Sequence, residues 1–498
     1  MPKCNLTFAP AGKPREGRTG SGRLAAQWSG VAASVAGLLA GVAHAQSSAQ
    51  PAAPADESLT WHGITLYGIV DIGIQYNTHS AAFSDYFISG GSDIVQKNSS
   101  KAVLGVTSNP MSQSRIGLQG NESLNFLDFS GVFKLETYFN PASGEITDAL
   151  KSVTQNNGRP VTAQSTNIDS SLAGQAFEQS FVGISSRTYG TLTFGRQNTT
   201  LADLIAKYDP QQVSYAFSLL GLSGTPAGGG DTQDRRFDDS IKYSARFMDL
   251  VHVGLHYKFQ NSTASQFATA GSGEAFSAFE GSVGADYAGA SVDAFYTKIR
   301  DAVSVGTLSA AQITALAAGL TSSNSVSGTI SDNESFGLMA SYNLAGITGG
   351  VAPVTLFGAW QRIAYMNPSI PLAAGFDDIG GYKLGAVNNA AYAKADKILK
   401  VYWAGARYAV TDHATLAVAY YGEKQDSYAT GVAAGCSTGA FSTCSGNLDV
   451  VSVSFDYRFT KRFDTYAGAM WSGVSGGLSN GYLNTSNIDP TIGVRFSF

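Results

Sequence analysis

Two histidines, His252 and His256, are four residues apart and are the first residues whose types and spacing could do chemistry. On a helix this spacing would put both imidazoles on one face, as metal ligands require. On a strand the two side chains share a face but lie about 13 Å apart, which is too far to bind one ion. The neighbouring residues alternate as in a strand, so we expect a solvated wall and no metal site.

No other constellation points to catalysis. Motifs of the G-x-S-x-G or phosphate-loop type do not occur in a suitable strand–helix context. Of the six histidines, His44 lies within the first 45 residues, which leaves five for the rest of the chain. We therefore expect no catalytic residue and no cofactor.

Cys436 and Cys444 lie close together in a segment rich in Gly, Ser and Thr, and the third cysteine, Cys4, lies near the start. In an exported chain a pair this close favours a disulfide that closes one exposed loop. Two free thiols are the alternative. A zinc site is disfavoured, because no histidine or third cysteine is nearby.

The first 45 residues have the order of a secretory signal. Four basic residues, Lys13, Arg15, Arg18 and Arg23, precede an uncharged apolar stretch, residues 31–42, which ends in Ala43-His44-Ala45. The apolar stretch is about half a bilayer span, too short for a membrane anchor. We predict cleavage after Ala45 and export to the cell envelope, with residues 46–62 as a short spacer.

Composition narrows the class of the remaining chain. Removing five of 32 basic residues and one of 37 acidic residues leaves 27 and 36, a formal charge of −9. This balance disfavours a nucleic-acid partner. Only 14% of residues are charged, 57 are Gly, and no apolar run of 18 or more follows residue 45, so transmembrane helices are not expected. A membrane β-barrel fits this composition.

From residue 64 onward, segments of alternating polarity recur. Within residues 64–76, the positions with the parity of Ile64 are mostly apolar, and the other positions include Thr65, Asp71 and Gln75. The same alternation occurs in residues 250–259, 451–459 and 492–498. In a strand it gives one oily and one wet face. A Lys or Arg that faces lipid at mid-bilayer costs roughly 2–4 kcal/mol, and in the clearest segments every charge has the wet parity.

This pattern favours membrane strands over a soluble β-rich adhesin, which would tolerate charges on either face. Two places depart from it. Arg196 shares the parity of Leu192 and Phe194, and residues 177–184 are apolar on both faces. We interpret both as candidates for a subunit interface.

Short and long connections alternate along the chain. Eight long polar stretches are expected to be loops: Thr78–Pro110, Asn140–Gly174, Gln197–Asp234, Asn261–Glu274, Asp301–Glu334, Asn367–Ala395, Gln425–Asn447 and Ser475–Asn487. The fold predicted is therefore all-β, with residues 63–498 forming a transmembrane, antiparallel up-and-down β-barrel of about sixteen strands. Short turns face the periplasm and long loops the exterior. Sixteen strands leave an aqueous channel, whereas eight would be filled by side chains.

Seven segments carry a resemblance to a known family. They are ITLYGIVDIGIQY, SRIGLQGNESL, KLETYFNP, QSFVGISSRTYGTLTFGRQ, RFDDSIKYSARF, YRFTKRFDTYAG and the terminal GVRFSF. In this order the chain resembles the general, non-specific porins of Gram-negative bacteria, and within them the trimeric sixteen-stranded branch of betaproteobacterial type.

The resemblance implies an outer-membrane channel for passive diffusion of small hydrophilic solutes and ions, not an enzyme. It also implies a homotrimer in contact with outer-membrane lipid and lipopolysaccharide. The terminal Phe498 would be an assembly signal for the barrel-assembly machinery. The third long loop, Gln197–Asp234, would fold into the lumen and face a ladder of basic wall residues.

Carried over by position, Arg115 and Arg236 match the family's wall arginines, and Arg196 matches an arginine at the subunit contact. The parity of Lys134, Glu136 and Lys242 makes them lumen-facing, and Asp203 and Asp209 open the third loop.

Glu178 stands where many relatives have another wall arginine. With the charge of −9 it predicts a mild preference for cations. The plainer interpretation of each charge is a solvated lumen wall without a role in selectivity.

Two other functions remain open. The same barrel could be a substrate-specific channel, for sugars or aromatic acids, because its loops are long and tyrosines are frequent. An outer-membrane enzyme such as a phospholipase would need a Ser–His pair on the outer face of the barrel. The sequence offers no such pair that can be defended.

Overall fold

The computed structural model describes residues 59–87, 89, 91, 93–165, 176–221, 236–259, 277–346, 353–373, 382–393, 396–437 and 441–498. The predicted signal sequence, residues 1–45, and residues 46–58 of the predicted spacer lie outside them. Thr60–Trp61 (β1), at the end of the predicted spacer, pairs with the first long strand.

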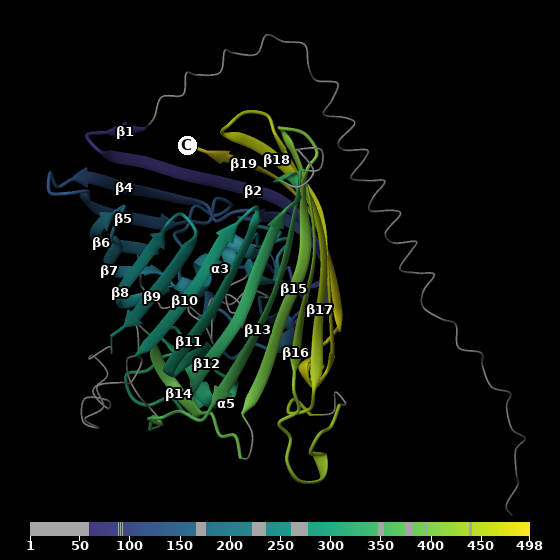
Figure 1. The fold of residues 1–498 in the computed structure, drawn as a ribbon. Helices are drawn as coiled ribbons and strands as arrows, with labels where there is room; N and C mark the ends of the chain where they lie inside the picture. Colours follow the sequence, from purple (N-terminus) through teal and green to yellow (C-terminus); the bar gives the residue numbers. More distant parts are fainter. Residues whose placement is uncertain are drawn as a thin grey trace, which may run out of the picture. The chain divides into compact units, whose positions relative to one another are not determined.

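Among the described residues, nineteen strands form a single sheet, and three of them are short strands that pair with the ends of longer ones: β1 and β3 (Lys101–Ser108) with β2 (Ile64–Ser80), and β14 (Lys383–Asn389) with β12 (Ser325–Asn343). The other sixteen form a closed antiparallel ring, which confirms the predicted fold (Figure 1). They are β2 (Ile64–Ser80), β4 (Arg115–Ser123), β5 (Phe129–Tyr138), β6 (Gln179–Ser186), β7 (Gly190–Asn198), β8 (Arg236–Phe247), β9 (Val251–Lys258), β10 (Ala278–Tyr287), β11 (Ala290–Gly306), β12 (Ser325–Asn343), β13 (Val354–Met366), β15 (Lys397–Ala409), β16 (Ala414–Gln425), β17 (Gly446–Arg458), β18 (Phe463–Gly476) and β19 (Ser486–Ser497).

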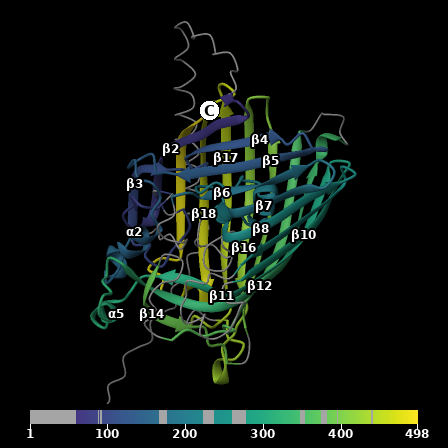
Figure 2. The same ribbon diagram turned by 90° about the vertical axis from the view of Figure 1, so that its left-hand side faces the viewer.

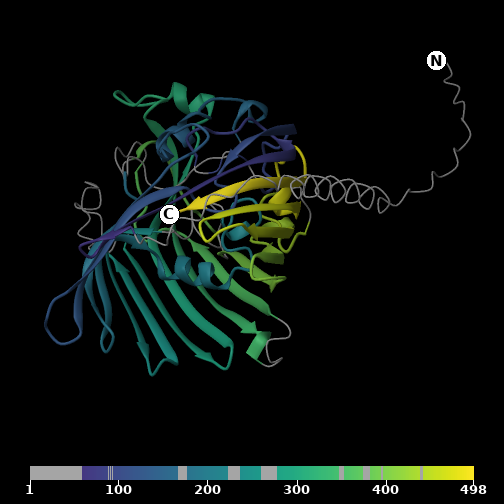
Figure 3. The same ribbon diagram turned by 90° about the horizontal axis from the view of Figure 1, so that it is seen from above.

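The ring closes where the last strand meets the first. β19 pairs with β2 from Thr491 opposite Gln75 to Ser497 opposite Ile69. Beyond it, the backbone amides and carbonyls of Phe498 and Gly68 exchange two hydrogen bonds of 3.0 Å each. A Cβ at Gly68 would lie 2.3 Å from the Phe498 ring, so only glycine fits there. Figure 3 shows the yellow C-terminal strand beside the purple first strand. The first and last long strands thus pair with each other and close the sheet.

The alternation in the sequence corresponds to the two faces of the ring. In β2, Val70 and Ile74 are exposed on the outside, whereas Asp71 and Gln75 on the inside are fully buried. The outer positions suit lipid, and the inner positions take part in polar networks.

In the part of the chain that the structure describes, helical segments occur only in the connections between barrel strands. They are α2 (Ala149–Thr154), α3 (Thr200–Tyr208) and α5 (Ala310–Thr314), with 3-10 turns η1 (Val161–Ala163), η2 (Leu219–Gly221), η3 (Leu344–Gly346), η4 (Gly431–Ala433) and η5 (Gly477–Ser479). None of the helices in the described residues is long and apolar enough to cross a membrane.

The third long loop folds into the lumen, as predicted (Figure 3). Its helix α3 is capped by Thr199, whose hydroxyl accepts a 3.1 Å hydrogen bond from the Ala202 amide. One side of α3 is apolar and packs, together with η2, on the inner wall formed by β11 to β18. The core that they form consists of Leu201, Leu204, Ile205, Tyr208, Leu219, Leu220, Phe295, Met339, Ile363, Leu399, Val401, Trp403, Ala419, Tyr421, Val450 and Met470. The glycines Gly228 to Gly230 of this loop lie outside the described residues.

The first loop also packs inside the ring, which the sequence pattern did not predict. Its Phe87 is buried against Tyr215 of the third loop. The amide of Val95 donates a 2.7 Å bond to the Ser472 hydroxyl of β18, and the amide of Leu483 donates to the Lys97 carbonyl. The first, third and eighth loops are therefore held together.

A second apolar core joins three other loops on the side of the long connections. Val153 of α2 packs with Val305, Ile330 and Leu384, which belong to β11, β12 and β14. Figure 2 shows α2, α5 and β14 gathered at the same end of the barrel. These loops therefore pack against one another through a shared apolar core.

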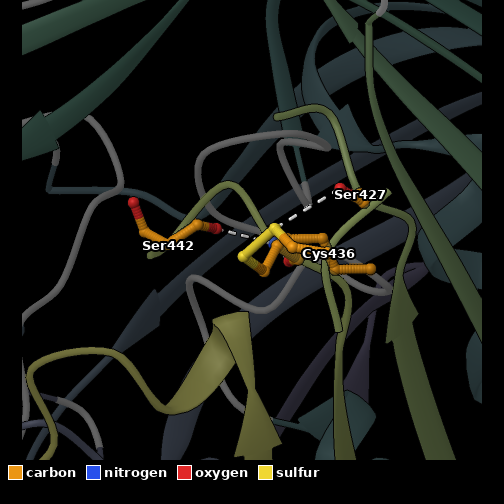
Figure 4. The surroundings of a disulfide bond; sticks show 5 residues. Ser427, Cys436 and Ser442 are labelled. Carbon is orange, nitrogen blue, oxygen red and sulfur yellow. Dashed lines mark hydrogen bonds between the residues drawn. A yellow bond between two sulfur atoms is a disulfide. The ribbon is translucent and has the colours of Figure 1, made fainter. Parts of the chain in front are cut away.

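A disulfide joins Cys436 to Cys444 in the seventh loop, with Cα atoms 4.9 Å apart (Figure 4). The Ser427 hydroxyl lies 3.9 Å from the Cys436 sulfur.

We expect the double substitution Cys436→Ser with Cys444→Ser to speed protease cleavage within this loop. The cross-link restricts the unfolded states of the loop and so stabilises its folded form by about 2–3 kcal/mol. Limited proteolysis with mass spectrometry measures this, and Ser427→Ala is the matched control. Equal cleavage rates in the native protein and the double variant would contradict the expectation.

Candidate functional site

A cavity of about 830 Å³ opens on the inside of the barrel between one part of the wall and α3. Its polar lining includes Gln119 of β4, Lys134 of β5, Gln179 of β6, Gln197 of β7, Lys242 of β8 and Asp203 of α3. The position of the third loop explains this. It covers the apolar inner wall of β11 to β18 and leaves the polar wall of β4 to β8 free.

Charges at the cavity wall form compact clusters. Glu136 is buried and accepts hydrogen bonds from the Tyr67 hydroxyl (2.8 Å) and the Gln179 amide (2.9 Å). It also forms ion pairs with Lys134 Nζ at 3.4 Å and Arg115 Nε at 3.7 Å. Two cations therefore share one carboxylate, and the cluster has a net charge of +1.

A second cluster is centred on Glu178. Its carboxylate lies 3.1 Å from Arg236 Nη1 and 3.6 Å from Arg196 Nη2, and Arg196 also pairs with Asp238. The Arg236 guanidinium lies over the Tyr138 ring, 4.7 Å from its centroid, and donates to the Tyr138 hydroxyl. The four charged side chains of this cluster are only 10–18% exposed. They are therefore less accessible from the lumen than the ladder of basic wall residues implied by the family resemblance. The two positive and two negative charges of the cluster cancel.

An ion pair connects β8 of the polar wall to the first turn of α3. Lys242 Nζ donates 2.9 Å to the Asn198 carbonyl and pairs with Asp203 on the first turn of α3. Asp203 is the more exposed of the two, at 51% of its side chain. Asp203 and Lys242 thus lie together at the edge of the cavity.

Asp209 and His256 differ from their sequence-based expectations. Asp209 is fully buried and accepts hydrogen bonds from the Tyr421 hydroxyl and from the Gln211 and Val213 amides. It fixes the turn after α3 and has no surface on the lumen. His256 is also buried, between Glu280 and Ser240, and is not part of a solvated wall.

The two histidines have separate partners, and the described residues contain no group of three or more potential metal ligands. His252 Nε2 lies 2.6 Å from Asp293, which also binds Lys207 Nζ at 2.9 Å. Lys207 lies in the last turn of α3, so this cluster anchors the C-terminal end of α3 to β11. Sequence parity marks Asp293 as inward-facing, but only the fold brings Lys207 to it.

The buried Asp93 in the first loop should make the docking of that loop depend on pH. Its carboxylate accepts bonds from Gln75 and Ser89 and lies beside Asp489, and burial raises its pKa from 3.8 to about 8. The docked loop keeps a proton that the undocked loop loses near pH 4. The stability of docking therefore falls as the pH rises towards 8 and levels off above it.

Hydrogen exchange of first-loop amides, corrected for intrinsic rates, measures this dependence. Protection should decrease from pH 5 to pH 8 in the native protein. It should vary much less in Asp93→Asn, which stays neutral. Protection that increased with pH would contradict the argument.

Comparisons with known proteins agree with the fold. A family model described as Gram-negative porin matches residues 31–477. An outer membrane porin protein of Bordetella pertussis is 26% identical over 197 residues, which are 39% of this chain and 42% of that protein. The match therefore spans less than half of the relative's length.

Two solved structures are similar in fold. The anion-selective porin from Comamonas acidovorans has a TM-score of 0.55 at 17% identity, over 87% of this chain and 99% of that one. The trimer form of OmpT from Vibrio cholerae has a TM-score of 0.51 at 14% identity, over 87% of this chain and 99% of that one.

Proposed function

Because the chain belongs to the Gram-negative porin family, we propose that it forms a water-filled channel in the outer membrane for passive diffusion of small hydrophilic solutes and ions. The observation that carries the proposal is the polar cavity between the β4–β8 wall and α3. Solutes would pass along this wall, because α3 covers the opposite one. They would contact the side chains of Arg115, Lys134, Lys242 and Asp203. The more buried charges, Glu136, Glu178 and Arg236, would contribute to the electric field along this path without touching the solutes.

Liposome swelling with a series of neutral sugars tests the proposal. Rates should fall steadily with solute size and show no saturation, as expected for a general pore. Saturable uptake inhibited by one solute would favour the substrate-specific alternative. Liposomes that stay impermeable to every solute would contradict the channel itself.

Ion selectivity depends on the charges nearest the path. Around the cavity, Arg115, Lys134 and Lys242 face Glu136 and Asp203, an excess of one positive charge. This excess opposes the cation preference predicted from the charge of −9, since distant surface charges are screened within about 10 Å at 0.1 M salt. We propose that these opposing contributions leave the channel only weakly selective between anions and cations.

Lys134→Glu should shift the reversal potential towards cation permeability. The variant changes the local charge by two units, so the permeability ratio should change by roughly threefold, the order expected for unit charges several ångströms away in water. The matched control is Lys134→Gln, which should give about half of the shift. No shift in either variant would mean that solutes do not pass this wall.

A homotrimer is proposed from the family and from the trimer form of the OmpT structure. The outer face of β6 supports it, because Val182 and Ile184 are exposed there at 61% and 43%. Phe181 of the same strand lines the cavity beside Gln179 and Ser185, so the inner face of β6 is mixed and its outer face is the more apolar one. Cross-linking in membranes would test this, with Val182→Arg expected to weaken the trimer. Assembly of the barrel through Phe498, and a subunit contact at Arg196, remain predictions.

A further inference from the structure

At the seam where β19 pairs with β2 (Figure 3), two carboxylates lie beside each other inside the barrel. Asp93 belongs to the first loop, and Asp489 lies on the inner face of β19. The two residues are only 1% and 0% exposed. Within the described part of the chain, no Lys, Arg or His forms an ion pair with either carboxylate. When both are ionised, the pair is a buried negative charge that no described cation compensates.

Contacts with the barrel wall fix the position of the pair. Gln75 of β2 donates a hydrogen bond to Asp93 Oδ1, and the Asn487 side-chain amide of β19 lies 3.5 Å from the Asp93 backbone carbonyl oxygen. Gln75 is directly opposite Thr491, which is two residues from Asp489 and faces inward like it. The first loop supplies one carboxylate and the last strand supplies the other. The two therefore come together only while the first loop is docked.

One oxygen atom of the pair lacks a hydrogen-bond donor. Asp489 Oδ1 accepts a 2.9 Å hydrogen bond from the Met470 amide, but Asp489 Oδ2 is buried and accepts none from the described residues. A buried charged acceptor without a partner is costly, and the neighbouring carboxylate of Asp93 adds repulsion. A proton on Asp93 removes one of the two charges, whereas a divalent cation removes both. The open oxygen is therefore a suitable ligand for a cation.

We propose that Asp93 and Asp489 bind a calcium ion, which fastens the first loop to the barrel seam. Calcium prefers carboxylate, hydroxyl and amide oxygens. The Ser89 hydroxyl lies 3.5 Å from Asp93 Oδ2, and the Gln75 side-chain amide contacts Asp93 Oδ1, so neutral oxygens lie beside the pair.

The enclosure of the pair favours calcium over magnesium. Calcium accepts about six to eight oxygens in irregular geometry, whereas magnesium requires a near-ideal octahedron and retains several waters. With only two acidic ligands, the dissociation constant should be roughly 0.1–1 mM, as for weak extracellular calcium sites.

Hydrogen exchange of first-loop amides in the full-length protein tests the proposal. Exchange in about 10 mM calcium is compared with exchange in EDTA at equal ionic strength and about pH 8, because protons compete with metal for carboxylates. If only the docked loop binds the ion, calcium at this concentration should slow exchange by about tenfold to a hundredfold. Magnesium should slow it much less. Asp93→Asn and Asp489→Asn should each abolish the calcium effect.

Glu423→Gln is the matched control. Glu423 is another buried carboxylate with an unpartnered oxygen, but no second carboxylate among the described residues lies beside it. This variant should keep the native calcium response. Calorimetric titration with calcium should find one bound ion fewer per chain in Asp489→Asn than in Glu423→Gln, since other calcium-binding groups are the same in both.

Three results would overturn the proposal. The first is exchange in the native protein that calcium does not slow. The second is a calcium response, or a bound-ion count, that persists in Asp489→Asn. The third is a loss of protection in Asp489→Asn that is equal in calcium and in EDTA, because a purely structural hydrogen-bonding role predicts that outcome.

Discussion

We expect a roughly twofold or larger rise in single-channel conductance when Thr200–Gly221, the segment with α3 and η2, is replaced by a short Gly/Ser linker. The reason is that a sixteen-strand ring without an inner loop leaves a wider aqueous path. It should also lower thermal stability. Without the loop, Phe295, Trp403 and Met470 on the inner wall face water. Burial of such side chains contributes roughly 1.5–3 kcal/mol each. Planar-bilayer recordings and thermal unfolding in detergent measure the two effects.

The control for this variant replaces α5 (Ala310–Thr314) with the same type of linker, because no residue of that helix is buried. Its conductance should equal that of the native protein. Conductance that stayed unchanged on removal of α3 would mean that the third loop does not limit the path.

The second large effect concerns Asp71, a fully buried carboxylate on the inner face of β2. It accepts hydrogen bonds from the Met111 amide (2.9 Å), the Ser112 amide (2.5 Å) and the Tyr466 hydroxyl (2.5 Å). It thereby connects β18 to the segment between β3 and β4 at the barrel seam. Asp71→Leu leaves three donors without an acceptor, of which the Met111 amide and the Tyr466 hydroxyl are buried. At about 1–3 kcal/mol for each, the loss is several kcal/mol.

We expect Asp71→Leu to reach the outer membrane poorly, and the folded fraction to lose its compact band on SDS gels at a much lower temperature. Asp71→Asn keeps one acceptor oxygen and should be affected less. Asp412→Leu, in the exposed turn after β15, is the control and should behave like the native protein. Equal stability of Asp71→Leu and the native protein would show that this network does not hold the seam.

The sequence was sufficient to predict the barrel strands, but it was insufficient to predict which loops pack inside the ring. Period-two alternation and the sequence of short and long connections predict sixteen strands, because a strand that faces lipid has a chemically uniform outer side. The inner side is not uniform. In β15 both parities are apolar: Leu399, Val401 and Trp403 lie beneath the third loop, and Ile398 and Tyr402 have the outer parity. From the sequence alone, a strand apolar on both faces indicates a candidate subunit interface. An inward-folding loop is the second cause of that pattern.

The same limit applies to the candidate site. Parity identifies Lys134, Glu136 and Lys242 as inward-facing, and the structure places Lys134 and Lys242 in the cavity lining. Parity cannot distinguish an open charge from a covered one. Asp209 is buried because the turn after α3 folds around it, and that turn depends on long-range contacts with Tyr421. The segment TLADLIAKY does contain a local signal: its apolar residues recur at helical spacing, which in a porin-like loop points to a helix packed on the wall.

Accessibility of single cysteines to a charged, water-soluble thiol reagent, recorded as current in planar bilayers, tests the central claim most directly. Cys436 and Cys444 are bonded to each other, so an introduced thiol has no competitor among the described residues. Asp203→Cys and Gln119→Cys should lose current on modification, because both side chains line the cavity between α3 and the wall. Leu338→Cys on the outer face and Val450→Cys beneath the third loop should be unaffected. Current that fell with Val450→Cys and persisted with Asp203→Cys would contradict the account.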